Sequence, residues 1–128
     1  MSTWRRKAIE AVPDLKTTLE TVENPMQAWI EIRMYFEGLS LVGDKNQIND
    51  ILNYARWCLS EEAGKLPNDT STAVCCAFYE HLPEKPANWS FFKEWFSPNE
   101  FESLKGVFSY HIKEEELKNL SSVFYGKK

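Results

Sequence analysis

The cysteines and histidines are the residues whose spacing could most readily indicate chemistry. The chain contains three cysteines, Cys58, Cys75 and Cys76, and two histidines, His81 and His111. No CxxC or HExxH spacing occurs among them, and the two histidines are thirty positions apart. Adjacent cysteines on a helix point about 100° apart, so they do not form a pair of ligands. The sequence therefore predicts neither a metal site nor a cofactor.

Nucleophilic catalysis is also poorly supported by the sequence. A reactive serine or cysteine needs a neighbouring base and a group that orients the base. Apolar residues surround the cysteines, and thiols in such surroundings are inert. Glu80 and His81 are sequence neighbours, which do not face each other on a helix. We expect His81 to bond a backbone carbonyl at a helix end, with catalysis as the lesser alternative, and we expect the protein not to be an enzyme.

The amino terminus and the odd number of cysteines bear on where the protein works. Glu10, Asp14 and Lys16 interrupt any apolar run behind the basic opening, so the sequence predicts no secretory signal. No stretch approaches the ~18 apolar residues that a membrane span needs. Three cysteines, two of them adjacent, make a poor disulfide framework. We expect a cytoplasmic protein with reduced thiols and no membrane partner.

Composition and charge set the class of protein. A chain of 128 residues with 43% hydrophobic and 27% charged positions has the size of one globular domain, over residues 1–128. Eight phenylalanines, five tyrosines and five tryptophans, with only five glycines and six prolines, exclude a disordered chain. The net charge of −4 argues against a nucleic-acid partner held by a basic surface.

Start and stop signals divide the chain into short helices. Asp44 with Gln47, and Ser97 with Glu100, have the spacing of capping boxes. Residues 73–79 are apolar nearly all round, which is typical of a helix in the middle of a bundle, and no apolar alternation of strand type occurs. The sequence predicts an all-α fold, a single compact bundle of six to eight short helices around a central apolar helix. The expected helices cover about 3–11, 13–22, 25 to Gly38 or Gly43, 45–64, 70–81, 89–96, 98–106 and 113–124. The fourth is expected to end at Gly64 and Pro67, and the fifth to begin at Asp69 or Ser71 and to end before Pro83.

Aromatic residues are concentrated between positions 89 and 110. One use of such a cluster is a binding hot spot, because tryptophan and tyrosine dominate these patches. We favour the alternative, a second packing layer, because Phe92, Trp95 and Phe96 have the spacing of one buried helix face. The cluster consists of Trp89, Phe91, Phe92, Trp95, Phe96, Phe101, Phe108 and Tyr110.

The environment of Trp57 has two interpretations. It lies about 180° around its helix from the apolar stripe that begins at Ile48. It shares that opposite face with Asp50 and Asn53. Either the helix packs on both sides, or Trp57 is an exposed anchor among acidic residues, and the sequence leaves both interpretations open.

The negative charge is concentrated in the middle of the chain. Residues 20–69 carry nine acidic and four basic side chains, a charge of −5, whereas residues 1–19 carry +2. Such a region would steer a basic protein toward it and raise its association rate, although a solvated acidic surface is the ordinary explanation. The residues predicted to contact a partner are Asp44, Asp50, Asn53, Trp57, Glu61, Glu62 and Asp69.

Three motifs give the chain a resemblance to known proteins. They are Asn53-Tyr54-Ala55-Arg56-Trp57-Cys58-Leu59, Ser71-Thr72-Ala73-Val74 and Ala77-Phe78-Tyr79-Glu80-His81-Leu82-Pro83. Together with the opening Trp4-Arg5-Arg6-Lys7-Ala8, they resemble a family of small bacterial all-helical proteins of unassigned function. In size, acidity and lack of catalytic residues the chain is also similar to immunity proteins encoded beside polymorphic and contact-dependent bacterial toxins.

The second resemblance and the charge pattern together define the predicted function. We expect a non-catalytic immunity protein that binds and neutralises a basic bacterial toxin domain, with a nuclease as the favoured class. Acidic residues of the middle third would take the place of phosphates, and Trp57 would supply a desolvated contact. The alternative is a helical scaffold or adaptor domain, in which the acidic surface only keeps the protein solvated and Trp57 belongs to the core.

Overall fold

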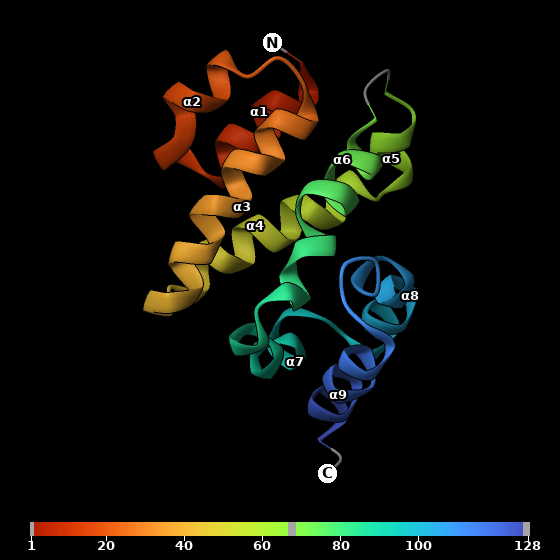
Figure 1. Cartoon of the computed structure of the whole chain (residues 1–128). Helices are drawn as coiled ribbons and strands as arrows, with labels where there is room; N and C mark the ends of the chain where they lie inside the picture. Colours follow the sequence, from red (N-terminus) through yellow and green to blue (C-terminus); the bar gives the residue numbers. More distant parts are fainter. Residues whose placement is uncertain (1, 67–68, 127–128) are drawn as a thin grey trace. The chain divides into compact units, whose positions relative to one another are not determined.

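All the regular secondary structure in the described part of the chain is helical. The computed structural model describes residues 2–66 and 69–126. Within these ranges it contains nine α-helices and three 3₁₀ helices, and no strand (Figure 1). The predicted all-α fold class is therefore confirmed. Two of the nine α-helices are single turns that hydrophobic periodicity does not distinguish from their neighbours.

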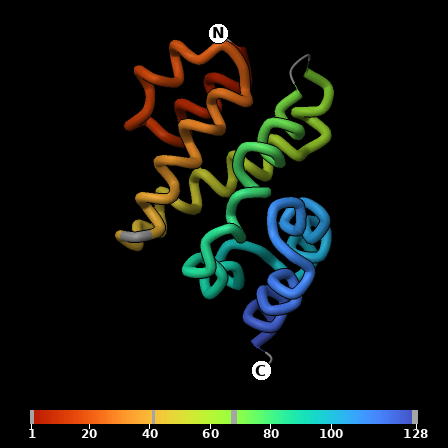
Figure 2. Tube along the Cα trace, viewed as in Figure 1, coloured from red at the N-terminus to blue at the C-terminus, as the bar shows by residue number. Residues whose placement is uncertain are grey.

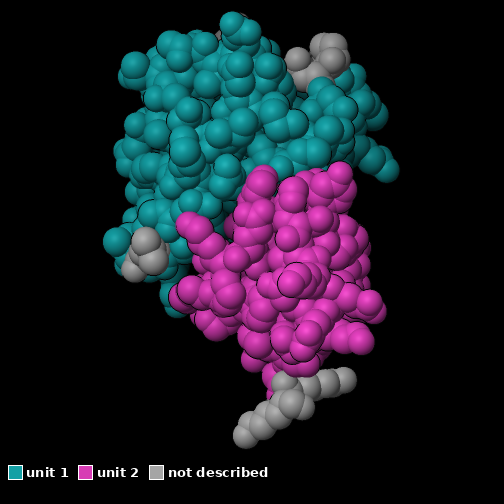
Figure 3. Space-filling model, in the orientation of Figure 1, with its two compact units in different colours: residues 1–78 teal, residues 79–128 magenta. Residues whose placement is uncertain are grey.

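The chain divides into two compact units, residues 1–78 and residues 79–128 (Figure 3). Each unit has its own buried aromatic side chains, and each is described by itself below. A single domain over residues 1–128 stays a prediction.

The first unit contains the longer helices, which the trace in Figure 2 follows from red to green. Local signals set several of their ends. The Asn24 side chain accepts a hydrogen bond from the backbone N–H of Gln27, and Gly43 ends the same helix with a φ of 73°, a conformation that favours glycine. The helices are α1 (Thr3–Ala11), η1 (Pro13–Leu15), α2 (Lys16–Thr21), α3 (Pro25–Val42), α4 (Lys45–Cys58), α5 (Glu61–Gly64) and α6 (Thr70–Ala77).

The core of the first unit lies where α3 packs against α6. Trp29 and Phe36 from α3 both contact the ring of Phe78, which directly follows α6. All three rings are fully buried. The apolar helix expected in the middle of the bundle is α6, and it packs against α3, α4 and α5 of its own unit.

Two details of α4 differ from the sequence prediction. Asp44 caps the helix by accepting from the Gln47 N–H, but the Gln47 side chain accepts from the Tyr35 hydroxyl at 2.7 Å, so it does not complete a capping box. The helix also ends at Cys58 rather than near Gly64. Ser60 caps the separate turn α5, and its side chain accepts from the Ala63 N–H. Pro67, which was expected to end the helix, lies outside the described residues.

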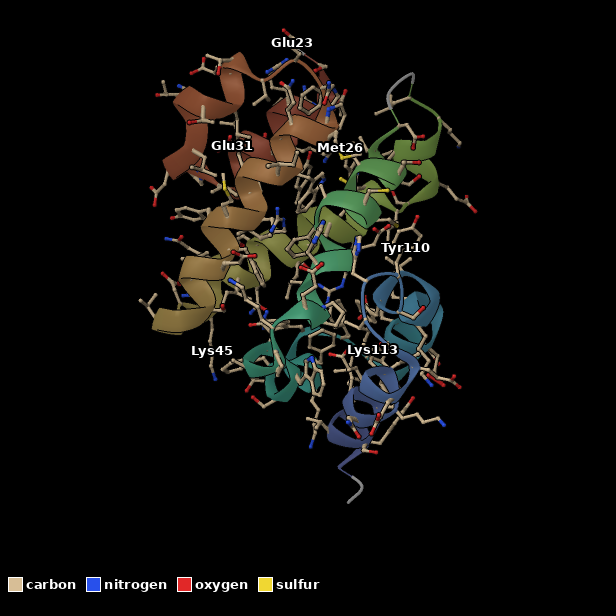
Figure 4. The ribbon with its side chains drawn as sticks, viewed as in Figure 1. Glu23, Met26, Glu31, Lys45, Tyr110 and Lys113 are labelled. Carbon is tan, nitrogen blue, oxygen red and sulfur yellow. The ribbon has the colours of Figure 1, made fainter. Side chains whose placement is uncertain are left out.

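The second unit packs around phenylalanines. Phe92, Phe96, Phe101 and Phe108 are buried and meet ring to ring, mostly edge-on or tilted. The favoured interpretation of the aromatic cluster, a packing layer, is borne out for these side chains, whereas Tyr110 is 73% exposed (Figure 4). The helices are η2 (Tyr79–Glu84), η3 (Pro86–Phe91), α7 (Phe92–Trp95), α8 (Pro98–Phe108) and α9 (Glu114–Tyr125).

Helix ends in the second unit show both the strength and the limit of local signals. The capping box of Ser97 and Glu100 is present with both of its hydrogen bonds. Gly106 does not end α8, because a glycine inside a helix costs only about 1 kcal/mol and the helix continues far enough to bury Phe108. Pro83 lies inside η2 rather than ending the helical segment.

Candidate functional site

An open hollow of about 300 Å³ lies between α1 and α4 in the first unit. We call it the α1–α4 hollow. It contains charged, amide and aromatic side chains together, so it can contact both polar and flat apolar groups of a partner. Its lining comes from Lys7, Glu10 and Ala11 on α1 and from Asp50, Asn53, Tyr54 and Trp57 on α4.

The positions of these side chains follow from helical spacing. Residues three and four apart lie on one face of a helix, which places Asp50, Asn53 and Trp57 together on α4 as the sequence predicted. On α1 the same spacing puts Lys7 and Glu10 beside one another. On α1 the buried apolar residues Trp4 and Ala8 lie on the face that adjoins Lys7. On α4 the face opposite the hollow is apolar and buried, and it includes Ile51, Leu52 and Ala55.

Trp57 is half-buried, so neither of the two interpretations of its environment describes it alone. Its ring stacks on Tyr54, with centroids 6.2 Å apart and planes 12° apart. The ammonium of Lys7 lies 5.1 Å from its ring centroid, within the range of a cation–π contact. Its Nε1 is enclosed and has no hydrogen-bond partner among the described residues. Trp57 therefore has one part in the packing of α4 and another in the hollow.

Tyr54 connects the floor of the hollow to the core. Its ring also stacks on Trp29, with centroids 5.1 Å apart and planes 13° apart. Burial raises the pKa of its hydroxyl far above the ordinary value of 10. Tyr54 therefore remains neutral at any physiological pH and serves as a rigid platform rather than as an acid or base.

The charges of the hollow are mixed but lean negative. Glu10 and Asp50 are exposed carboxylates, and Lys7 supplies a positive charge. The Asn53 side-chain oxygen accepts a hydrogen bond from Arg56 at 2.8 Å, so Arg56 holds the amide in one orientation. The arrangement can bind a cationic or hydrogen-bonding group beside an aromatic surface.

The other four residues predicted to contact a partner lie at the beginnings of helices rather than in the hollow. Asp44 caps α4, and Asp69 caps α6 by accepting from the Thr72 N–H. This backbone bond and a second one from the Thr72 hydroxyl lower the pKa of Asp69 below 3.8. Glu61 and Glu62 are exposed in the first turn of α5.

Lys7 and Glu10 are members of the hollow that sequence reasoning missed. The signal was present, because both lie outside the apolar stripe of α1 that Trp4 and Ala8 form. Nothing in the sequence, however, showed that α1 would lie beside α4. Only the packing of the two helices joins the lysine to Trp57, fifty positions later.

The histidines also have an arrangement that the sequence did not predict. The His81 ring stacks on the His111 ring, with centroids 4.9 Å apart and planes 16° apart. His81 Nδ1 lies 3.0 Å from Glu84 Oε1, and His111 Nε2 lies 3.0 Å from Glu80 Oε1. The expected bond from His81 to a carbonyl is thus replaced by a contact with a carboxylate.

The cysteines differ from one another in burial. Cys58 is buried, and burial raises the pKa of its thiol to about 11, although hydrogen bonding with Trp29 and Tyr54 opposes the rise. This agrees with the expected inert thiol. Cys75 and Cys76 are only half-buried.

Comparison with known proteins leaves the site to be interpreted from its own geometry. No protein-family model matches the chain, and neither a curated protein nor a solved structure matches it. Of the resemblance to small helical bacterial proteins, the all-helical fold is the part that the structure supports. Among the described residues, no helix is long and apolar enough to cross a membrane.

Proposed function

We propose that this chain is a non-catalytic immunity protein that binds a basic toxin domain of the nuclease class and covers its active site. One observation carries the proposal: half-buried Trp57 lies in one hollow with the exposed carboxylates of Glu10 and Asp50. Tryptophan is enriched among the residues that contribute most to binding between proteins. Carboxylates beside it would pair with the lysines and arginines that a nuclease uses to hold phosphates.

The charge of the surrounding sequence supports the same kind of partner. Residues 20–69 have a charge of −5, and α4 lies within this range. A basic domain approaching this region is attracted over about 10 Å at moderate ionic strength, which raises its association rate. Exposed carboxylates retain their hydration in the free protein, so they attract a partner without a large cost in stability.

Lys7 makes the proposal more specific. In the free protein its ammonium lies over the Trp57 ring, where an arginine of the partner would also bind. The lysine must therefore move aside or pair with an acidic group of the partner. Replacing it by methionine keeps most of the side-chain volume and removes the like charge. Lys7→Met is expected to strengthen binding of a toxin that inserts an arginine, whereas loss of the indole weakens it.

The test is binding of the chain to a purified candidate toxin domain of this class at low and high salt, with the affinity measured by calorimetry and the association rate by stopped-flow fluorescence. We expect a dissociation constant in the nanomolar range or below, with an association rate that falls as salt rises. Trp57→Ala and Asp50→Asn should each weaken binding at least tenfold. Glu20→Gln is the matched control, since Glu20 is an exposed carboxylate on α2 outside the hollow. A dissociation constant no lower than micromolar would contradict the proposal.

A helical scaffold or adaptor domain is the second candidate. It is favoured by the inner contacts of Trp57, which stacks on Tyr54 and has its Nε1 enclosed. On this hypothesis Trp57→Ala lowers the stability of the first unit but leaves affinity for every partner unchanged. Measuring unfolding and binding on the same variant distinguishes the two functions.

A further inference from the structure

Two histidines and two glutamates meet at one place in the second unit. His81, Glu84 and His111 each present a potential metal-ligand atom, and these atoms lie within 4.8 Å of one another. Glu80 is the fourth member, in contact with His111. The four residues come from η2 and from the turn between α8 and α9. The fold thus brings together the chain's two histidines, thirty positions apart in sequence.

We propose that His81, Glu84 and His111 bind a zinc-class divalent cation, with Glu80 orienting His111. Two imidazoles and one carboxylate are a donor set that zinc accepts, with a water as the fourth ligand of a tetrahedral site. The proposal is independent of the protein-binding function, because all four residues belong to the second unit and the α1–α4 hollow belongs to the first.

The distance between His81 Nδ1 and Glu84 Oε1 is already close to the distance between two ligand atoms of a bound zinc ion. The 3.0 Å separation is close to the roughly 3.3 Å between two ligands of a tetrahedral zinc with bonds of about 2.0–2.1 Å. A cation between the two groups replaces the proton that they share. To complete the set, the His111 ring must turn out of its parallel stack with His81, because the lone pair of a ligating nitrogen lies in the plane of its ring. The turn must also bring the ligand atoms, now within 4.8 Å of one another, to about 3.3 Å apart. His111 can do so because its side chain is 36% exposed and not packed on every side.

Glu80 distinguishes this cluster from a chance group of surface charges, because it is a buried carboxylate in contact with one of the histidines. It is buried, with 9% of its surface exposed, and its Oε1 lies 3.0 Å from His111 Nε2. Metal-binding histidines commonly donate their second ring N–H to a carboxylate, which fixes the tautomer and the ring orientation. With Nε2–H donated to Glu80, the Nδ1 lone pair of His111 is available for the metal.

The segment that carries His81 and Glu84 is held firmly. Within η2, the backbone carbonyls of Leu82 and Pro83 accept hydrogen bonds from the side chains of Asn88 and Trp89. Helix α8 packs against the same segment, and the His111 turn directly follows α8. A metal bound here would tie η2 to the α8–α9 turn, and it requires only side-chain movement.

The test is zinc titration of tag-free protein after treatment with a chelator, with competition against a zinc indicator. We expect saturable binding of one zinc per chain, weakened at least tenfold by Glu84→Gln and by His111→Asn. Glu80→Gln should weaken it about 10- to 100-fold. Glu115→Gln is the matched control, because Glu115 is an exposed carboxylate of the same unit outside the cluster. Glu84 is also exposed, so its substitution leaves the core intact.

Cobalt substitution and NMR identify the ligands. Cobalt bound by imidazole and carboxylate gives visible d–d bands without thiolate charge transfer, and zinc should shift the ring signals of both histidines. Thiolate bands would place the metal on the cysteines and overturn the proposal. The same conclusion follows if the wild-type protein shows no saturable zinc binding, or if Glu84→Gln and His111→Asn both bind zinc as tightly as wild type.

Discussion

The hydroxyl of Tyr54 donates a hydrogen bond to the backbone carbonyl oxygen of Trp4 across 3.0 Å. The two residues are fifty positions apart, and both side chains are buried. The bond joins the middle of α4 to the first turn of α1, which are the two helices that line the α1–α4 hollow. Because this bond helps to hold α1 against α4, it also supports the position of the Lys7 ammonium over the Trp57 ring.

Tyr54→Phe should lower the free energy of unfolding of the protein by about 1 kcal/mol, the usual net contribution of such a hydrogen bond. The ring remains, so its stacking on Trp29 and Trp57 is retained. Urea unfolding followed by far-UV circular dichroism measures the difference. Tyr110→Phe is the control for loss of an exposed hydroxyl, since Tyr110 is 73% exposed. An equal effect of the two substitutions would show that the bond from Tyr54 to Trp4 adds no stability.

Trp57 should contribute disproportionately to the tryptophan emission that acrylamide can quench. Trp4, Trp29 and Trp95 are buried, whereas Trp57 and Trp89 are half-buried, and of these two Trp57 lines the open hollow. Trp57→Phe should therefore lower the quenchable share of the emission, while Trp4→Phe should raise it. An unchanged quenching curve for Trp57→Phe would mean that the indole is closed off from solvent.

Asp69 should make α6 sensitive to acid. Hydrogen bonds from Thr72 lower its pKa below the ordinary 3.8, so its ionised form stabilises the folded state. This contribution is complete above about pH 3.8 and is lost as pH falls through the lowered value in the folded protein. Asp69→Ala should lower the unfolding midpoint at pH 7, and the difference should shrink in acid.

The control for this pH dependence is Asp69→Asn. Asparagine is a good N-cap but does not titrate. Asp69→Asn should keep most of the unfolding midpoint at pH 7 and lose only the part of the acid dependence that Asp69 contributes, as measured by thermal unfolding from pH 7 to pH 3. A deficit of Asp69→Ala that stays constant over this range would contradict the assignment of the effect to the carboxylate.

Helix beginnings were the part of the fold that the sequence predicted best. A capping side chain bonds a backbone N–H three residues later, so Asp44 and Ser97 reveal their role without any knowledge of tertiary structure. The side chain of Gln47 shows the limit of this reasoning. It had the spacing for a capping box, but the hydroxyl of Tyr35, from another helix, provides its partner instead.

The two sites differ in how far sequence could anticipate them. Asp50, Asn53 and Trp57 share a face of one helix, and helical periodicity alone places them together. The meeting of His81 with His111 could not be anticipated in this way. It depends on how η2 packs against α8 and on the turn that follows α8, both of which are set by burial of phenylalanines rather than by the histidines.

Cys58 should resist alkylation in the folded protein at pH 8. Its thiol is buried and its pKa is raised to about 11, so at this pH only about one molecule in a thousand carries the reactive thiolate. Cys75 and Cys76 are half-buried and should react earlier. Labelling with iodoacetamide in increasing urea, followed by peptide mass spectrometry, measures each cysteine separately. Cys58 should become labelled only as the first unit unfolds, with the same thiol in full denaturant as its own control.

The contrary outcome would be labelling of Cys58 in buffer as fast as that of Cys75 and Cys76. Tyr54 lines the α1–α4 hollow and also interacts with the Cys58 thiol. Fast labelling would therefore show that the floor of the hollow opens without unfolding of the first unit.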